Sequence, residues 1–280
     1  MKWNRVRRGT IGSPRSSGMV VGAGLLAAVL LSLGAAAVRA ADPELPPAET
    51  IIEKSIEASG GRAALEGIRS RKTFGRMEVP TMGIKAAALE YAAMPDRSYV
   101  LVESAEMGKI ESGSANGVYW EMTAMTGPRV KEGEERAVSE RTALNAGLRW
   151  RDFYSQAETA GTDTLDGRLC YRVILTPKTG SPETQWYDAE NWLMLKQEMT
   201  LTTPMGAIPM EFYPSEYREI EGVIMPFRVR QIVMKMQEML FTTDSVWFNV
   251  EIPDSVFAIP AAIQALLEKK EAEARAPVAQ

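Results

Sequence analysis

The sequence predicts a mainly β (α+β) protein, in which a strongly curved antiparallel sheet of about ten strands forms a half-barrel with helices on its concave side. Residues 184–231 alternate apolar and polar side chains with period two through four consecutive segments. Two short helical patterns precede the first strand, and a third interrupts the strands near mid-chain. A two-sheet sandwich would not need these helices, so one sheet wrapped around them is the better interpretation.

Residues 1–40 have the organisation of an export signal, which predicts a periplasmic protein. A basic stretch precedes the apolar stretch Met19 to Leu33, and Val38-Arg39-Ala40 has the small residues of a cleavage site. The alternative is an uncleaved anchor in the inner membrane, since residues 18–38 carry no charge. The expected organisation is a signal peptide at 1–40, a linker at 41–47, the half-barrel domain at 48–262, and a C-terminal helix and tail at 263–280.

Charge and residue usage exclude several classes of function. The whole sequence has 32 basic and 36 acidic residues. Residues 1–40 hold six of the basic residues and none of the acidic ones, so the body carries a net charge of about −10, which disfavours nucleic acid as a partner. The sequence contains no histidine, which removes histidine-dependent triads and the usual zinc sites. We therefore expect neither an enzyme nor a cofactor.

The predicted domain begins with two helices and a hairpin. Apolar residues at helical spacing follow Pro47, and Gly60-Gly61 ends this first helix. A second short helix is expected at residues 62–66, and a strand at residues 70–79 leads through a Pro-Thr-Met-Gly turn into a strand at residues 84–91. Another strand is expected at residues 97–103.

The middle of the domain changes from strand to helix and back. Asn116-Gly117 is a strong turn signal before a strand in which Val118, Trp120 and Met122 share a face. Residues 127–135 are expected to form a surface loop, and residues 136–150 a helix that either caps the sheet or acts as a lid over a cavity. A strand at residues 168–176 follows, and the lone Cys170 is expected there as a small strand residue.

The four-strand meander, whose last strand runs on to residue 236, and one further strand complete the predicted sheet. In the meander, Lys196, Glu198, Glu211 and Tyr213 fall on the wet face. The last strands are expected at residues 223–236 and 239–250, and a short amphipathic helix at residues 261–273 ends the chain.

The apolar face of this sheet is the candidate ligand-binding surface. Methionine is flexible and polarizable, which suits an adaptable lipid-binding wall, although a core that happens to use methionine is an equal alternative. A cluster of Met234, Met236 and Met239 resembles a soft-metal site, but alternation directs Met239 away from the other two, so we expect no metal. The candidate ligand-binding residues are Leu89, Tyr91, Trp120, Met122, Leu195, Met199, Met210 and Phe212.

Several motifs resemble those of the LolA/LolB-type outer-membrane lipoprotein carriers. Residues 114–120 resemble their Gly-x-x-Trp strand, Met94-Pro95 their basic-Pro position, and Phe257-Ala258-Ile259-Pro260 their closing Phe-x-x-Pro. The Gly60-Gly61 helix end, the turns at 80–83 and 166–167, and residues 221–226 look similar to uncharacterised exported relatives of the outer membrane lipoprotein-sorting type. One departure is that Met94 stands where the carriers have an arginine, so the polar latch of their empty state has no obvious counterpart.

This resemblance implies an open β-barrel whose concave apolar face, plugged by helices, receives acyl chains. The expected function is an exported binding protein that holds a lipid or lipoprotein acyl chain during transport of lipids or lipoproteins in the envelope. The alternative is an envelope interaction or sensing protein that docks a protein partner through the same fold without lipid.

Overall fold

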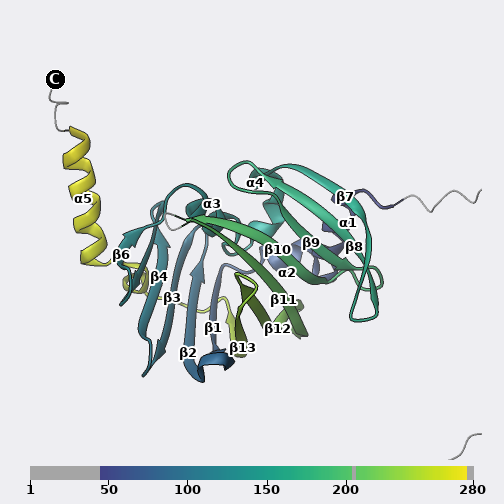
Figure 1. Cartoon of the computed structure of the whole chain (residues 1–280), viewed down its shortest axis with the longest axis horizontal. Coiled ribbons are helices and arrows are strands. Elements are labelled where there is room, and N and C mark those ends of the chain that lie inside the picture. Colours follow the sequence, from purple (N-terminus) through teal and green to yellow (C-terminus); the bar gives the residue numbers. More distant parts are fainter. Residues whose placement is uncertain (1–44, 204–205, 276–280) are drawn as a thin grey trace, which may run out of the picture. The chain divides into compact units, whose positions relative to one another are not determined.

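The structure, a computed structural model, describes residues 45–203 and 206–275. The predicted export signal and most of the predicted linker lie outside these residues, as does part of the turn expected at residues 204–206. Within them the chain forms one antiparallel sheet whose strands follow the order β6-β5-β4-β3-β2-β1-β13-β12-β11-β10-β9-β8-β7 (Figure 1). The sheet is a meander in two arms that meet where the first strand pairs with the last.

The thirteen strands are β1 (Ser70–Val79), β2 (Ile84–Ala93), β3 (Arg97–Ser104), β4 (Gly108–Ala115), β5 (Val118–Thr123), β6 (Gly127–Val130), β7 (Tyr154–Leu165), β8 (Arg168–Pro177), β9 (Glu183–Asp188), β10 (Met194–Thr203), β11 (Gly206–Ile220), β12 (Val223–Val233) and β13 (Gln237–Phe248). The helices are α1 (Ala48–Ala58), α2 (Gly61–Glu66), α3 (Gly133–Arg141), α4 (Trp150–Phe153) and α5 (Ala261–Arg275), with short 3-10 turns η1 (Pro80–Met82), η2 (Ala146–Arg149) and η3 (Asp254–Phe257).

The mainly β class and the curved antiparallel sheet are confirmed, but the sheet has 13 strands and not about ten. Strands β4, β6 and β7 were not predicted. The sequence predicted a loop at residues 127–130, because Gly127 and Pro128 disfavour strands. In the structure these residues pair with β5 at the edge of the sheet, where proline is tolerated. The single helix expected at residues 136–150 is divided into α3, η2 and α4, with Asn145 in the left-handed region at φ 61° before η2.

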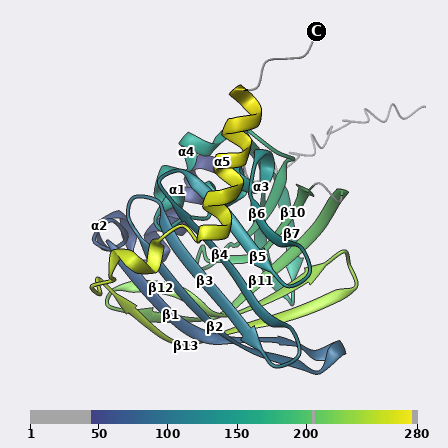
Figure 2. The same ribbon diagram turned by 90° about the vertical axis from the view of Figure 1, so that its left-hand side faces the viewer.

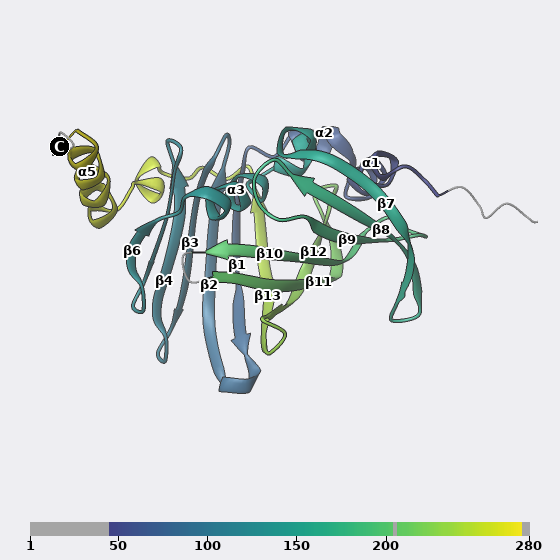
Figure 3. The ribbon, with the colours of Figure 1, turned by 45° about the horizontal axis from the view of Figure 1, so that its top comes forward.

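Helix α3 shows how strongly the sheet is curved. Near its start Glu135 accepts two hydrogen bonds from Arg129 on β6, and its last residue, Arg141, pairs with Glu183 on β9. These strands are ten strand spacings apart in the sheet, about 48 Å if it were flat, whereas a helix of nine residues is about 14 Å long. The sheet therefore curls around α3, and Figure 3 shows the two arms approaching beneath the helices.

We call the face toward α1 and α3 the inner face and the opposite one the outer face. Cross-strand partners share a face, so the pairing assigns whole rows of residues. Arg71 on β1 lies on the inner face, and a buried cluster on the same face contains Met77, Val79, Ile84, Ala86 and Val102. A second inner cluster joins Ile51 and Ile52 of α1 to Trp150, Val173, Leu175 and Tyr187. The core of the domain thus lies inside the curve.

The outer face is polar over much of its area and covered at one place. Lys196 pairs with Glu198 and Glu211, and the Tyr213 hydroxyl donates to Glu211, which confirms the predicted wet face of the meander. The C-terminal η3 contacts β3 and β4, and α5 contacts β6, outside the sheet (Figure 2). This segment lies on the face that carries Trp120. None of the helices in the described residues combines the length and the apolar character that crossing a membrane requires.

Candidate functional site

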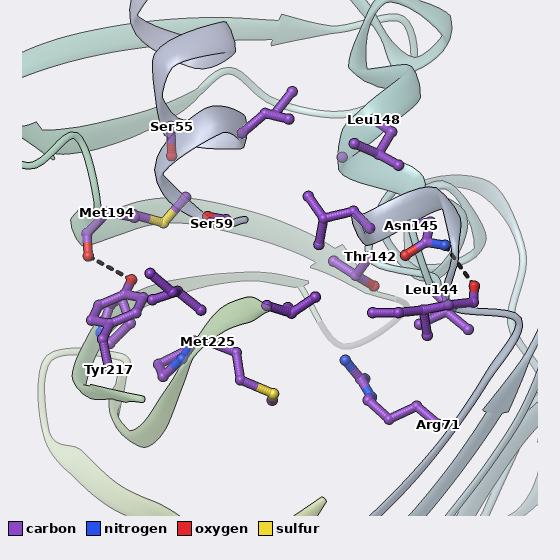
Figure 4. Close-up of a pocket in the computed structure, with 18 of the residues that line it drawn as sticks. Ser55, Ser59, Arg71, Thr142, Leu144, Asn145, Leu148, Met194, Tyr217 and Met225 are labelled. Carbon is purple, nitrogen blue, oxygen red and sulfur yellow. Dashed lines mark hydrogen bonds between the residues drawn. The ribbon is translucent and has the colours of Figure 1, made fainter. Parts of the chain in front are cut away.

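The larger of two apolar cavities lies between the helices and the inner face of the sheet, and its volume is about 390 Å³. Figure 4 shows Ser55 of α1 and Ser59, the residue that follows the helix, on one side, Leu144 and Leu148 on another, and Met225 and Arg71 below. Most of the lining is apolar: Ile56, Leu65, Ile68, Leu144, Leu148, Met194, Pro214, Val223, Met225 and Phe248.

Helix α1 presents different residues to the core and to the cavity. Ile51 and Ile52 are buried in the core cluster, and Ser55 and Ser59, one turn apart, line the cavity. At its end the Ser59 carbonyl accepts a hydrogen bond of 3.0 Å from the backbone N–H of Ile224 on β12. The helix is therefore attached to the sheet at the cavity wall.

The connection between α3 and α4 closes the opposite side. Asn145, in its left-handed conformation, donates from Nδ2 to the Ile68 carbonyl at 2.9 Å. Arg62 of α2 donates to the Leu148 carbonyl, also at 2.9 Å. These bonds join segments about 80 residues apart in sequence, and they fix the position of the α3–α4 connection relative to the sheet.

Glu53 holds α1 to both neighbouring helical segments. Its carboxylate accepts hydrogen bonds from Arg62, Arg151 and the Trp150 indole N–H, at 2.8 to 3.3 Å. Burial by itself would raise the pKa of Glu53, but the hydrogen bonds from Arg151, Arg62 and Trp150 together lower it to about 2. The carboxylate is thus charged at neutral pH and connects the helices above the cavity.

A second cavity of about 280 Å³ adjoins the first. Its apolar lining includes Ile52, Trp150, Phe153, Leu175 and Tyr187, and its polar lining includes Arg141, Gln185 and Gln197. Both cavities are lined by the same five residues: Ser55, Ile56, Thr142, Gly147 and Met194. A single elongated ligand could therefore contact both.

A buried polar network lies at the wall of the second cavity. Arg141 Nη2 is 3.4 Å from Glu183 Oε2, and the side chains of both residues are at most 4% exposed. The Tyr154 hydroxyl and the Gln185 amide also donate to Glu183, and the Tyr187 hydroxyl donates to Gln185. Burial, together with the charge of Glu183, raises the pKa of Tyr154 and of Tyr187 well above the usual value, so both hydroxyls stay protonated donors.

A third, smaller cavity of about 190 Å³ continues from the first past Thr142, Ala143 and Leu144 and is more polar. Glu90 lines it and accepts a hydrogen bond of 2.8 Å from Arg71. Burial lowers the pKa of Lys131 on the same wall. The inner face therefore changes from apolar to polar toward β4 and β5.

The structure separates the eight predicted ligand-binding residues. Phe212 pairs with Gln197, which lines the second cavity, so Phe212, Met199 and Met210 lie on the inner face. Tyr91 pairs with Lys72, whose ammonium also lies over the Trp247 ring, so Tyr91 and Leu89 lie on the outer face, opposite the side expected from the sequence. None of the eight lines either of the two apolar cavities, and ligand binding by them stays a prediction.

Trp120, Met122 and Leu195 also lie apart from the cavities. Trp120 pairs with Gly113, and the centroids of the Trp120 and Tyr99 rings are 6.3 Å apart. This places Trp120 and Met122 on the outer face. Trp120 is 2% exposed, and a Cβ added at Gly113 would lie 2.7 Å from its ring. Leu195 lies at a β-bulge between Met194 and Lys196, which changes the alternation on which its assignment depended. The three methionines weighed as a metal site also diverge, because Met239 packs in an inner cluster and Met236 is exposed.

Sequence reasoning missed the cavity residues on α1 and on the α3–α4 connection. The amphipathic pattern of α1 predicted a buried face, and Ser55 on that face was the available signal. Arg71 gave none, because alternation within one strand does not indicate which face is inner. In the described residues no group of three or more acidic or cysteine side chains is arranged to hold a metal ion.

Solved structures of other proteins have the same architecture. A DUF1329 family protein from Desulfovibrio piger superposes with a TM-score of 0.52 at 15% identity, covering 76% of this chain and 98% of its own. A LolA superfamily protein from Nitrosomonas europaea superposes with a TM-score of 0.51 at 15% identity, covering 77% and 99%. The chain has the fold of the LolA superfamily. A domain from Vibrio parahaemolyticus, provisionally named for outer membrane lipoprotein sorting, superposes with a TM-score of 0.51 at 13% identity, covering 75% of this chain and 97% of its own.

The resemblance expected from the sequence motifs is thus confirmed at the level of the LolA-like fold. No family model matches the sequence, and no curated protein matches it. At these identities the likeness shows the fold alone, so the function of this LolA-like domain has to be argued from its own cavities.

Proposed function

We propose that this protein binds an amphiphile with a long apolar portion, a lipid or the acyl chain of a lipoprotein, in the two joined apolar cavities. The observation that carries the proposal is their shared wall of five residues, which lets one elongated ligand contact both cavities. Pockets that bind small molecules have volumes of roughly 300–1,000 Å³ and mostly apolar linings. The larger cavity, at about 390 Å³, lies within this range.

The inner-face residues of the meander extend this space. Met199, Met210 and Phe212 continue the rows of Gln197 and Pro214, which line the cavities. We propose that they contact the part of a long ligand that passes beyond the cavities toward the β10–β11 turn. The flexible methionine side chains would adapt to chains of different length.

The binding experiment uses the full chain, freed of lipid with detergent, and a fluorescent fatty-acid analogue. Wild-type protein should bind the probe with saturation, and unlabelled lipid should displace it. Ser55→Trp places an indole in the wall common to both cavities and should weaken binding by at least tenfold. Lys54→Trp adds the same side chain at an exposed position of the same helix and should leave binding unchanged. Absence of saturable probe binding by the wild type would contradict the proposal.

A second candidate function is docking of a protein partner on the outer face. Phe74 and Trp247 are large apolar side chains on neighbouring outer-face strands and are 43% and 44% exposed. A docking role predicts that Phe74→Ser with Trp247→Ser abolishes association with a partner isolated from the envelope, while Ser55→Trp preserves it. The opposite pattern would assign the association to the cavities.

We also propose that the chain is exported and acts in the periplasm, as residues 1–40 suggest. Mass spectrometry of the protein from fractionated cells should find a mature chain that begins at Ala41. An intact N-terminus in the membrane fraction would instead indicate the retained anchor.

A further inference from the structure

Arg141 has a hydrogen-bonding group that the folded chain does not use. Its side chain is 4% exposed, and Nη2 faces Glu183 at 3.4 Å. Its other terminal nitrogen, Nη1, is buried and has no hydrogen-bond partner among the described residues. Among the residues that the structure describes, Arg141 is also the only charged one that lines the second cavity. A buried guanidinium N–H without an acceptor is costly, so this nitrogen marks a place where an acceptor from a ligand would stabilise the protein.

The carboxylate of Glu183, the negative partner of Arg141, already has its hydrogen bonds from neighbouring side chains. Glu183 receives hydrogen bonds from the Tyr154 hydroxyl and the Gln185 amide in addition to its contact with Arg141. Gln185 is in turn fixed by the Tyr187 hydroxyl. The unused capacity of the network is therefore one N–H donor, Nη1 of Arg141, on a residue that lines the second cavity.

The charges of the cavities identify the kind of acceptor. Arg141 is neutralised by Glu183, and Arg71, which lines the first cavity, is neutralised by Glu90. A carboxylate or phosphate bound at Nη1 would add an uncompensated negative charge to a buried neutral pair, which is unfavourable. A carbonyl oxygen accepts the same hydrogen bond without adding charge.

We propose that the second cavity holds the neutral carbonyl group of an acylated ligand, an ester or an amide, with Arg141 Nη1 as its hydrogen-bond donor. Ile52, Trp150, Leu175 and Met194 provide the apolar wall around this point. The assignment rests on the proposed lipid-binding function and narrows it from any apolar chain to an acyl ester or amide. Arg141 then distinguishes acylated lipids from hydrocarbon chains that lack a carbonyl.

The test compares ligands that differ only at this group. A monoacylglycerol, a monoalkylglycerol ether and a free fatty acid of equal chain length each displace the fluorescent probe from the full chain. We expect the ester to bind about tenfold more tightly than the ether, because an ether oxygen is a poor acceptor. We also expect it to bind more tightly than the fatty-acid anion.

Variants then locate the preference. Arg141→Met with Glu183→Gln removes both charges together and avoids leaving a buried unpaired carboxylate. It should bind ester and ether equally, because the donor that distinguishes them is gone. Arg172→Met is the matched control, because Arg172 also has a buried nitrogen without a partner but lines neither apolar cavity, and it should keep the ester preference.

A measurement on the wild type makes the test independent of how the variants fold. Infrared spectroscopy of a monoacylglycerol labelled with carbon-13 at the carbonyl should show a lower stretching frequency in the complex than in an apolar solvent. Equal binding of ester and ether, tighter binding of the fatty-acid anion, or an unshifted carbonyl would each overturn this inference and leave lipid binding in place. Failure of all three ligands to bind would overturn the proposed function itself.

Discussion

Glu53 is the residue on which the arrangement of helices above the cavity depends most directly. Its three donors come from α2 and α4, so one carboxylate holds three helical segments together. Because the bonds are made by the charged form, the pKa falls from 4.5 to about 2 in the folded protein. A carboxyl group with a depressed pKa contributes stability that is fully present above its unfolded pKa and is lost as the pH falls through the folded value.

Glu53→Gln should therefore destabilise the protein most above pH 4.5, and the difference from wild type should shrink as the pH falls toward 2. Urea unfolding at a series of pH values measures this difference. Glu57→Gln on the same helix is the control, since the Glu57 side chain is 69% exposed and pairs with Lys54, which is also exposed. A difference that stays constant from pH 7 to pH 2 would contradict the stated role of Glu53.

Gly60 allows α1 to approach β12. Its φ is 113°, and an added Cβ would lie 2.2 Å from the carbonyl oxygen of Gly222. Gly61 also has a positive φ, of 81°, but nothing lies within 4 Å of its Cβ position. Gly60 is thus required both by its left-handed backbone conformation and by the lack of room for a Cβ, whereas Gly61 is required by its conformation alone.

Gly60→Ala should lower the free energy of unfolding by about 3 kcal/mol or more, since strain of roughly 1–3 kcal/mol is joined by a clash with backbone. Gly61→Ala should cost only the strain, about 1 kcal/mol. Thermal and urea unfolding measure both variants. Equal losses would show that α1 can move away from Gly222 without cost.

The C-terminal segment, η3 and α5, packs on the outer face of β3–β6. Phe257 is buried beneath the Arg97 guanidinium, 4.9 Å from its ring centre, and Ile263 of α5 is fully buried. Lys270 of α5 pairs with Glu132 at 2.7 Å. This segment therefore stabilises the sheet from the side opposite the cavities.

Phe257→Ala should lower the free energy of unfolding by about 3–5 kcal/mol, as expected for removal of a buried aromatic side chain. Affinity for the fluorescent lipid should not change, because the cavities lie on the other face. Ser255→Ala in the same turn is exposed and should have little effect on either property. Loss of lipid binding in a folded Phe257→Ala protein would show that the two faces are coupled.

Over the whole molecule, curvature creates the binding space. Alanines at 86, 88 and 92 lie on the inner face of β2, where the curl leaves little room, while Leu89 and Tyr91 lie outside. Helices α1 and α3 keep the arms apart, and the cavities are the space that their side chains leave unfilled. Such cavities cost the empty protein contacts that a ligand would restore.

A bound ligand should therefore raise the melting temperature of the whole domain. At a free concentration of one hundred times Kd, binding stabilises by about 2.7 kcal/mol, which corresponds to a shift of roughly 5–10 °C for a domain of this size. Differential scanning fluorimetry with a monoacylglycerol measures the shift. At the same ligand concentration Ser55→Trp should show about half of the wild-type shift or less, because its affinity is at least tenfold weaker. A shift equal to that of the wild type would place the ligand elsewhere.

Local pattern accounts for what could be predicted. Period-two alternation and turn residues such as Gly83 and Gly222 act within a few residues, so the meander, the first hairpin and the helical nature of α1 followed from them. Strand β6 was missed because its four residues begin with Gly-Pro and are held only by pairing with β5. The bulge before Lys196 is equally a property of the pair and not of one strand.

The sequence by itself determined that this is a mainly β protein with a wet face and an apolar face, and its motifs indicated the LolA-like fold. Only the tertiary structure decided which face is inside, because alternation defines two faces without ordering them. It also brought Ser55, Thr142 and Met194 to one wall, and placed Arg141 beside Glu183. Those contacts join residues that are 40 to 140 positions apart, and they form only when the sheet curls around its helices.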